Sequence, residues 1–192
     1  LRRHNHLCIV GNHDMAAVGR MDTEEFNPQA AFAADWTAAT LTERSRNFLL
    51  GLPDRLEAEP FTLVHGSPRS PIWEYITNAR IAAANFEQFD TPACLVGHSH
   101  VPSLYIDEDG HVIGQMPGAG DRVEIGPKPV IANPGGVGQP RDGDPRAAYA
   151  LYDSETHILE WRRVEYPIQV TQQRMRQFGL PVRLIDRLTY GW

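Results

Sequence analysis

The chain has 192 residues, of which 42% are hydrophobic and 22% are charged, so it is long enough to bury the core of one ordinary domain. No apolar run approaches the roughly 20 residues that a membrane-spanning helix needs. The net charge of −6, with no basic run, argues against a general nucleic-acid-binding surface. If such an acidic protein binds phosphate, it must supply positive charge locally, through metal ions or a few arginines.

Apolar runs and helix-capping residues predict alternating strands and helices in the first half of the chain. Asn27 is a favourable cap and Pro28 fits the first turn of one helix, while Thr42 can start the next. The predicted elements are, in chain order, a buried strand at 7–10, two helices within 24–53, a strand at 61–66, a helix at 78–89 and a strand at 93–100.

The second half consists mostly of predicted strands. Asp109 and Gly110 form a favoured two-residue turn, which predicts a hairpin over residues 103–114. Further strands are predicted within 122–126, 129–136, 146–153 and 157–166, followed by two short helices within 168–192 that are broken at Gly179 and Pro181. The order of elements favours a layered α/β domain with more than one sheet.

The two cysteines, Cys8 and Cys94, both lie in apolar runs. Such positions favour small buried thiols over a disulfide bond. Free thiols are typical of a reducing compartment, so we expect a cytoplasmic protein.

Three predicted strands end in the same way, with a glycine beside a histidine: GNHD at 11–14, VHG at 64–66 and GHSH at 97–100. A single histidine at a strand end is ordinarily a surface or core residue, but three in one pattern indicate a site at the carboxyl edge of an α/β sheet. Neutral imidazoles and an amide oxygen suit divalent metal ions. His98 and His100 could face two different ions, and paired ions about 3.5–4 Å apart can act on a phosphoryl group.

These three motifs, in this order, resemble the calcineurin-like metallophosphoesterase superfamily, and residues 133–153 resemble its compact bacterial phosphodiesterase branch. The resemblance implies an α/β fold, a four-layer sandwich of two mixed β-sheets flanked by helices. It covers most of the chain, so we expect a single metallophosphoesterase domain over residues 1–192.

The resemblance also implies a role for each residue of the motifs. Asn12, His65 and His98 would bind one divalent ion, and His100 would bind the other. His13 would face the scissile phosphate, and Asp14 would hold His13 in the correct tautomer. The ions would be Mn, Fe, Ni, Co or Zn, and a hydroxide that bridges them would be the nucleophile.

The loop after residue 133 allows two interpretations. Arg141 and nearby backbone amides could bind phosphate oxygens, or the loop could be a structural turn in which Asp142 and Asp144 pair with arginines. Arg69 and Tyr75 could likewise cover the site, although an ordinary surface loop is the simpler interpretation.

The family pattern also has an Asp-x-His motif and a Gly-Asp-x-x-Asp motif before the first of these segments, and the sequence printed here begins after both. Residues 109–111 and 120–124 match them only faintly and stand in the wrong order, so we expect neither to replace them. The predicted function is metal-dependent hydrolysis of a small phosphoester, most favourably a phosphodiester or nucleotide. The alternative is an impaired fragment that binds metal or phosphate as a scaffold. We expect no membrane or nucleic-acid partner, and an exposed sheet edge would favour a homo-oligomer.

Overall fold

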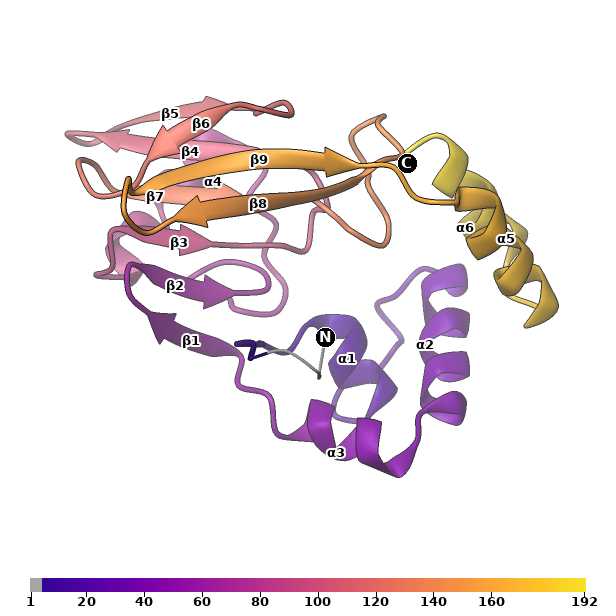
Figure 1. Ribbon diagram of the computed structural model, residues 1–192. Coiled ribbons are helices and arrows are strands. Elements are labelled where there is room, and N and C mark those ends of the chain that lie inside the picture. The colour runs from indigo at the N-terminus through magenta and orange to yellow at the C-terminus, as the bar shows by residue number, and fades with distance from the viewer. Residues whose placement is uncertain (1–4) are drawn as a thin grey trace.

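The structure is a computed structural model that describes residues 5–192, and Figure 1 shows its arrangement. Within these residues no helix is both long and apolar enough to cross a membrane. The helices are α1 (Asn12–Ala17), α2 (Pro28–Thr40), α3 (Glu43–Leu50), α4 (Ala79–Ala83), η1 (Phe86–Gln88), α5 (Ile168–Gln177), α6 (Val182–Asp186) and η2 (Arg187–Thr189). The strands are β1 (Arg55–Ala58), β2 (Phe61–Val64), β3 (Ala93–Leu95), β4 (Ser103–Glu108), β5 (His111–Gln115), β6 (Arg122–Glu124), β7 (Val130–Asn133), β8 (Ala147–Asp153) and β9 (Ile158–Val164).

The larger sheet has six strands in the order β1-β2-β3-β7-β4-β5. Its centre is parallel, because β2 pairs with β3 and β3 pairs with β7 in the same direction. The outer pairings of β1 with β2, β7 with β4 and β4 with β5 are antiparallel. The parallel centre determines the position of the site, since the loops after β2, β3 and β7 all leave from one edge of the sheet.

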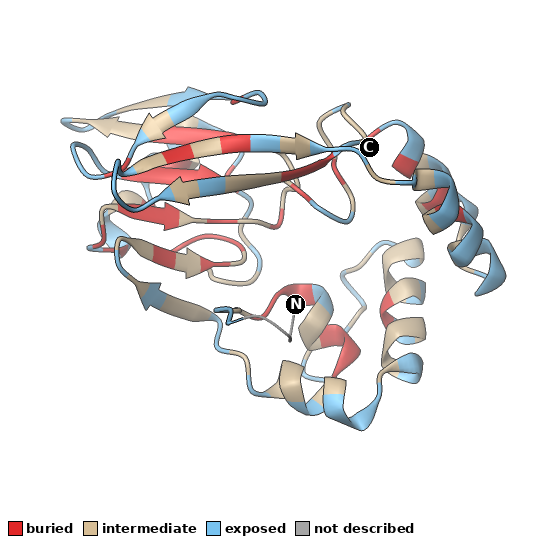
Figure 2. Ribbon diagram, in the orientation of Figure 1, coloured by how far each residue is buried: buried red, intermediate tan, exposed pale blue. Residues whose placement is uncertain are grey.

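The smaller sheet is fully antiparallel, in the order β6-β9-β8. Its Leu159 and Trp161 pack against Leu104, Val130 and Ala132 of the larger sheet, forming one hydrophobic core between the two sheets. The opposite face of the larger sheet forms a second core with α4, in which Ala82 packs with side chains such as Cys94 and Ile131. Figure 2 shows this burial concentrated in the strands. The predicted α/β architecture of two sheets flanked by helices is confirmed, and the mixed character belongs to the larger sheet.

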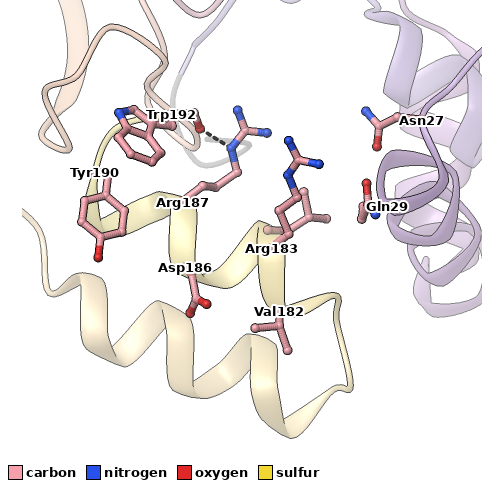
Figure 3. A pocket seen from close by; sticks show the side chains of 9 residues that line it. Asn27, Gln29, Val182, Arg183, Asp186, Arg187, Tyr190 and Trp192 are labelled. Carbon is pink, nitrogen blue, oxygen red and sulfur yellow. Dashed lines mark hydrogen bonds between the residues drawn. The ribbon is translucent and has the colours of Figure 1, made fainter.

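The remaining helices lie beyond the edge at which the parallel strands end. Figure 1 shows α1, α2 and α3 grouped on one side of that edge and α5 and α6 on the other. The predicted caps are confirmed, because Asn27 Oδ1 accepts a hydrogen bond from the Ala30 amide and Thr42 Oγ1 accepts one from the Ser45 amide. The end of α6 and η2 face the start of α2 across a cleft (Figure 3).

The structure differs from the sequence-based prediction at residues 7–10, which form an extended segment outside any strand. The Val10 amide donates a hydrogen bond to the Pro53 carbonyl, but no strand ladder forms there in the described part of the chain. An apolar run predicts burial and not pairing, and a strand requires a neighbouring strand to pair with. The predicted helix at 78–89 is also broken, because α4 ends at Ala83 and η1 follows as a separate turn.

Both cysteines are free thiols, as predicted. Cys94 is buried in the core of the larger sheet, whereas Cys8 is half-buried in the extended segment. Burial raises the pKa of the Cys94 thiol to about 12, so this side chain behaves as an apolar core residue.

Candidate metal and phosphate site

Polar residues that follow the parallel strands lie together at one edge of the larger sheet. β2 runs into His65, β3 runs into His98 and His100, and α1 begins at Asn12 directly after the extended segment. The carboxyl ends of adjacent parallel strands meet at the same sheet edge, so loops that follow them converge there. The result is a hollow of about 340 Å³, which we call the histidine pocket; its lining includes all seven predicted site residues, Asn12, His13, Asp14, His65, His98, His100 and Arg141.

Three potential metal-donor atoms approach one another closely in this pocket. His65 Nε2 lies 3.0 Å from Asn12 Oδ1 and 2.9 Å from His98 Nδ1. Donor atoms that bind one ion at about 2.1 Å in neighbouring octahedral positions are themselves about 3.0 Å apart. The spacing of Asn12, His65 and His98 therefore fits a shared divalent ion.

The electrostatics of the pocket suit neutral imidazole ligands. Burial, reinforced by neighbouring histidines, lowers the pKa of His65 to about 3. Burial and the nearby His100 lower the pKa of His98 to about 4, and burial and Arg141 lower that of His100 to about 4. At neutral pH these rings are therefore uncharged and carry the nitrogen lone pair that a metal ion requires. The buried Nε2 of His98 has no hydrogen bond of ordinary geometry in the structure.

The backbone of the pocket is held in unusual conformations. His98 and His100 both have φ of 60°, in the left-handed region that side chains other than glycine rarely adopt. Such residues cost of order 1–3 kcal/mol each and concentrate at functional sites. Gly11 permits a further close approach, because a Cβ atom there would lie 3.0 Å from the His65 ring.

His100 is held by the loop after β7. Its Nδ1 lies 2.7 Å from the carbonyl oxygen of Gln139, and its own carbonyl accepts a hydrogen bond from the Arg141 amide at 3.2 Å. The contact with Gln139 leaves Nε2 as the second possible donor atom of the ring. His100 is thus tied to the loop after β7, whereas His98 joins Asn12 and His65.

His13 is exposed at the start of α1, where its ring packs edge-on against Phe26 with ring centroids 4.8 Å apart. Partial burial and the positive charge of Arg141 lower its pKa, and the charge of Asp14 opposes this shift. The predicted hydrogen bond from Asp14 to the His13 ring is absent from the described residues. Instead, Asp14 Oδ2 accepts the Gly11 amide at 2.9 Å, because successive residues of a helix do not face each other. Asp14 therefore positions His13 by fixing the start of α1.

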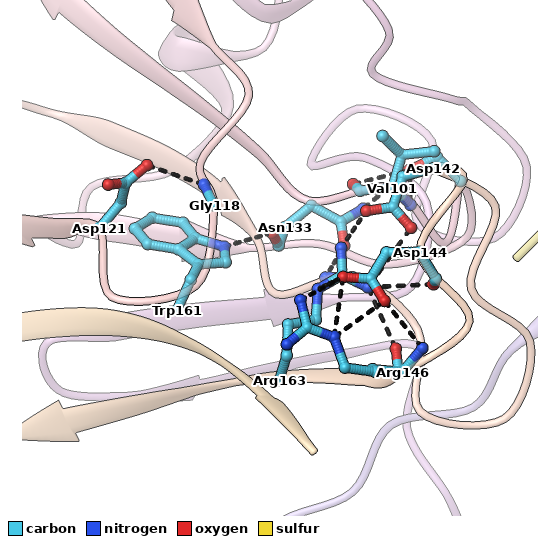
Figure 4. A network of polar contacts seen from close by, with 11 residues as sticks. Val101, Gly118, Asp121, Asn133, Asp142, Asp144, Arg146, Trp161 and Arg163 are labelled. Atoms are coloured by element: carbon cyan, nitrogen blue, oxygen red, sulfur yellow. Dashed lines mark hydrogen bonds and ion pairs between the residues drawn. The ribbon is translucent and has the colours of Figure 1, made fainter. Parts of the chain in front are cut away.

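In the loop after β7, the predicted pairing of Asp142 and Asp144 with arginines is confirmed, and phosphate binding by Arg141 stays a prediction. Arg141 points its charge at the histidine pocket, and its guanidinium donates to Gln139 Oε1 at 2.8 and 3.2 Å. Asp142 and Asp144 meanwhile pair with Arg163, whose side chain is only 7% exposed. Figure 4 shows these carboxylates around Arg163, with Arg146 on Asp144. The ion pairs hold the loop that presents Arg141.

Asn133, at the end of β7, organises the loop that carries the histidines. Its Nδ2 donates to the Gly97 carbonyl at 2.7 Å and to Ser99 Oγ at 2.9 Å, while its carbonyl accepts the Trp161 indole N–H at 2.9 Å (Figure 4). Asn133 therefore connects the smaller sheet to the loop that carries His98 and His100. Its side chain is buried and does not line the pocket.

The segment after His65 covers one side of the pocket. Tyr75 stacks on His98 with ring centroids 3.8 Å apart and planes inclined by 18°. Arg69 lies outside the lining and pairs with Glu74, which also accepts hydrogen bonds from Ser67 Oγ and Asn85 Nδ2. The covering role considered for this segment thus belongs to Tyr75, and Arg69 secures the loop.

Comparison with known proteins identifies the family. Residues 2–157 match the calcineurin-like phosphoesterase superfamily domain, which is most of the chain. This chain belongs to the calcineurin-like phosphoesterase superfamily. The metallophosphoesterase of Sphaerobacter thermophilus has a solved structure that is 48% identical, with a TM-score of 0.86 over 96% of this chain and 76% of that chain.

Two further relatives of this calcineurin-like phosphoesterase are archaeal. An uncharacterized protein of Methanocaldococcus jannaschii is 32% identical over 100% of this chain and 78% of its own length. The structure of a hypothetical protein of Pyrococcus horikoshii OT3 has a TM-score of 0.78 at 20% identity, covering 100% of this chain and 75% of that chain, and shows a shared fold.

Family membership supports a hydrolase that acts on phosphoesters, and the family generally binds divalent metal ions. Within residues 5–192, no group of three or more His, Cys, Asp or Glu side chains is arranged to hold a metal ion. The candidate ligand set therefore depends on the amide of Asn12 as well as on His65 and His98. Tyr75 and Gln139 also line this pocket. The sequence indicated Tyr75 as a candidate but not Gln139, because the position of Gln139 beside His100 depends on tertiary contacts.

Proposed function

We propose that this calcineurin-like phosphoesterase hydrolyses phosphodiesters of small molecules or nucleotides at the histidine pocket, with two divalent ions of the Mn, Fe, Ni, Co or Zn type. One observation carries the proposal: His65 Nε2 lies within 3.0 Å of both Asn12 Oδ1 and His98 Nδ1, the spacing of neighbouring donor atoms around one ion. These three residues would hold one ion, and His100 would contribute to the other. When bound, the ions would supply Lewis-acid activation of water and stabilisation of developing negative charge.

The side chains around the ligands have separate tasks. Arg141 donates to the neutral Gln139 side chain through Nε and Nη2, which leaves Nη1 and the second hydrogen of Nη2 for phosphate oxygens. His13 is exposed at the mouth of the pocket, where a neutral ring can donate its N–H to a phosphate oxygen. The negative charge of a bound phosphate would raise the pKa of His13 and so favour proton transfer to the leaving oxygen.

One observation favours the alternative function, a scaffold that binds metal or phosphate without catalysis. Among the described residues that line the pocket, the acidic side chain is Asp14, and its carboxylate is engaged by the Gly11 amide. All the other candidate ligands are uncharged, so a pair of divalent ions would meet little negative charge from these residues.

Metal analysis combined with a turnover assay tests the proposal. The purified protein is supplied with Mn²⁺, its bound metal is quantified, and hydrolysis of bis-para-nitrophenyl phosphate is compared with that of para-nitrophenyl phosphate. We expect bound metal and faster turnover of the diester. Bound metal without turnover of either ester would favour the scaffold, and faster turnover of the monoester would contradict the diester assignment.

A further inference from the structure

A second hollow lies beside the histidine pocket, at the C-terminal end of the chain. It has a volume of about 670 Å³ and separates α2 from the segment formed by α6 and η2. We call it the arginine cleft; its characteristic lining residues are Asn27, Gln29, Arg183, Arg187, Tyr190 and Trp192. Figure 3 shows the guanidinium groups of Arg183 and Arg187 projecting to the same side, toward the start of α2.

Among the described residues, the arginines of this region have no side-chain carboxylate as a partner. Ion pairs within residues 5–192 engage Arg55, Arg69, Arg122, Arg146, Arg162, Arg163 and Arg176, but none involves Arg141, Arg183 or Arg187. Asp186 also lines the cleft, but its carboxylate approaches Arg176 of α5 at 3.9 Å, and Figure 3 shows it pointing away from the two guanidinium groups. In a chain with a net charge of −6, this is a local concentration of unneutralised positive charge.

The three arginines are close enough to repel one another. Besides partial burial, the charges of Arg141 and Arg183 lower the pKa of Arg187. Holding like charges together costs free energy, which an anion bound between them would offset. Arg187 also donates through Nε to a main-chain oxygen of Trp192, the last residue of the sequence, which balances part of its charge and fixes its orientation while its terminal nitrogens remain available.

The cleft and the histidine pocket are separate hollows that lie near each other, because the charge of Arg187 acts on His100 and that of Arg141 acts on Arg187. The Arg141 amide bonds the His100 carbonyl, and two residues further the Gly143 amide bonds the Gly191 carbonyl at 2.9 Å. Gly191 has φ of +69° and lies so close that a Cβ atom there would be 2.6 Å from the Asp144 backbone. One short loop therefore carries Arg141 of the histidine pocket and also contacts Gly191, which lies between two residues that line the cleft, Tyr190 and Trp192.

An aromatic pair lies at the end of the cleft. Tyr190 and Trp192 are stacked with ring centroids 4.9 Å apart and planes inclined by 27°, and they are 53% and 63% exposed. An exposed aromatic face beside a positive groove is the combination that binds nucleobases, because a base can stack while the arginines bind its phosphates.

We propose that the arginine cleft binds the part of the substrate beyond the reacting phosphate: Arg183 and Arg187 receive a second phosphate group, and Tyr190 and Trp192 stack on an aromatic base. The substrate class is then a nucleotide with at least two phosphate groups. This assignment rests on the proposed function only in naming the bound molecule a substrate, since binding in the cleft can be measured without turnover.

Calorimetric titration of metal-free protein with ADP, in the presence of a chelator, tests the assignment. Adenosine serves as the ligand without phosphates and inorganic pyrophosphate as the ligand without a base. The variants are Arg183→Gln and Arg187→Gln, and the matched control is Arg174→Gln on the exposed surface of α5. Arg183 is exposed, and no hydrogen bond of its side chain is found among the described residues, so its replacement keeps the test valid if loss of the Arg187 contact to Trp192 loosens the fold.

We expect ADP to bind more tightly than either adenosine or pyrophosphate, and each cleft variant to raise the Kd for ADP at least about tenfold, the effect of losing one charged contact worth roughly 1.4 kcal/mol. The control should bind as the wild type does. Absence of ADP binding, or equal Kd values for Arg183→Gln and wild type, would overturn the assignment. ADP binding that depends on both arginines in a protein without phosphoester turnover would keep the assignment and overturn the proposed function.

Discussion

The histidine pocket and the arginine cleft lie near each other but differ in how firmly the fold supports their residues. The pocket histidines His65, His98 and His100 follow the parallel strands β2 and β3, so the two hydrophobic cores hold their backbone in place, whereas Asn12 and His13 begin α1 after an extended segment. The cleft residues lie on α6, η2 and the residues after them, where side chains are largely exposed and the elements are short (Figure 2). The family match ends at residue 157, before this segment begins.

Under the proposed function, this difference separates the part of the molecule that would carry out the chemistry from the part that would recognise the substrate. Ligands of a metal ion must keep their positions within a few tenths of an ångström, which packed strands and helices ensure better than loosely held segments. A surface that recognises the rest of a substrate tolerates looser construction, because charge and stacking act over a wider range of geometries. The predictions below test this contrast.

The largest effect is expected from removing a ligand of the histidine pocket. In His65→Ala, one of the three convergent donor atoms is lost, so we expect bound metal to fall severely and turnover of bis-para-nitrophenyl phosphate to reach background. The measurements are metal content by mass spectrometry and the rate of nitrophenol release. The control, His111→Gln, changes an exposed histidine of β5, and equal metal loss in both variants would contradict the ligand assignment.

A smaller loss is expected when the pocket keeps its ligands and loses His13. His13→Asn should lower kcat about 10²–10⁴-fold, as the loss of a general acid does, while metal content stays at the wild-type level. Because Asp14 holds the start of α1 through Gly11, the helix should survive the change. If instead the variant lost metal along with activity, His13 would belong to the ligand set and not to the proton-transfer step.

The loop that joins the two regions depends on a buried ion pair. Arg163 and Asp142 have side chains that are 7% and 10% exposed, so Arg163→Gln leaves a buried carboxylate without its partner. We expect a loss of about 3–5 kcal/mol in the free energy of unfolding, measured by urea denaturation. The control is Arg55→Gln, which breaks an exposed pair with Glu57 and should cost about 0–1 kcal/mol. Similar losses in the two variants would show that the loop is not held by this pair.

The smallest effect concerns the loop that places Tyr75 over His98. Hydrogen bonds from Arg69, together with those from Ser67 and Asn85, lower the pKa of Glu74 from 4.5 to about 2. A carboxyl group whose pKa is lower in the folded state stabilises the fold above the unfolded pKa, and this stabilisation is lost as the pH falls through the folded pKa. The melting temperature should therefore fall more steeply between pH 4.5 and 2 in wild type than in Glu74→Gln.

The matched control for this pH effect is Glu57→Gln, which alters an exposed ion pair with Arg55 and lies outside the lining of the pocket. Its melting curve should keep the wild-type slope across the same pH range. A Glu74→Gln variant with an unchanged slope would mean that the loop is held by other contacts.

Much of the fold follows from local patterns. The caps at Asn27 and Thr42, the hairpin turn at Asp109 and Gly110, and the break at Gly179 act over a few residues, and each is where the sequence predicts it. Residues 7–10 were predicted incorrectly as a strand, and β1 was not predicted, because strand formation depends on a pairing partner that can lie far along the chain.

The sequence by itself determined the GNHD, VHG and GHSH motifs. These motifs were enough to indicate the family and, with it, the class of chemistry. Tertiary structure alone decided that Asn12, His65 and His98 share one point, that Asp14 bonds Gly11 in place of His13, and that Tyr75 stacks on His98. It also brought Arg187 of the last helical turn beside Arg141. The reason is physical: a motif specifies donors and local conformation, whereas distances between donors from separate segments are set by how the strands pair and the loops pack.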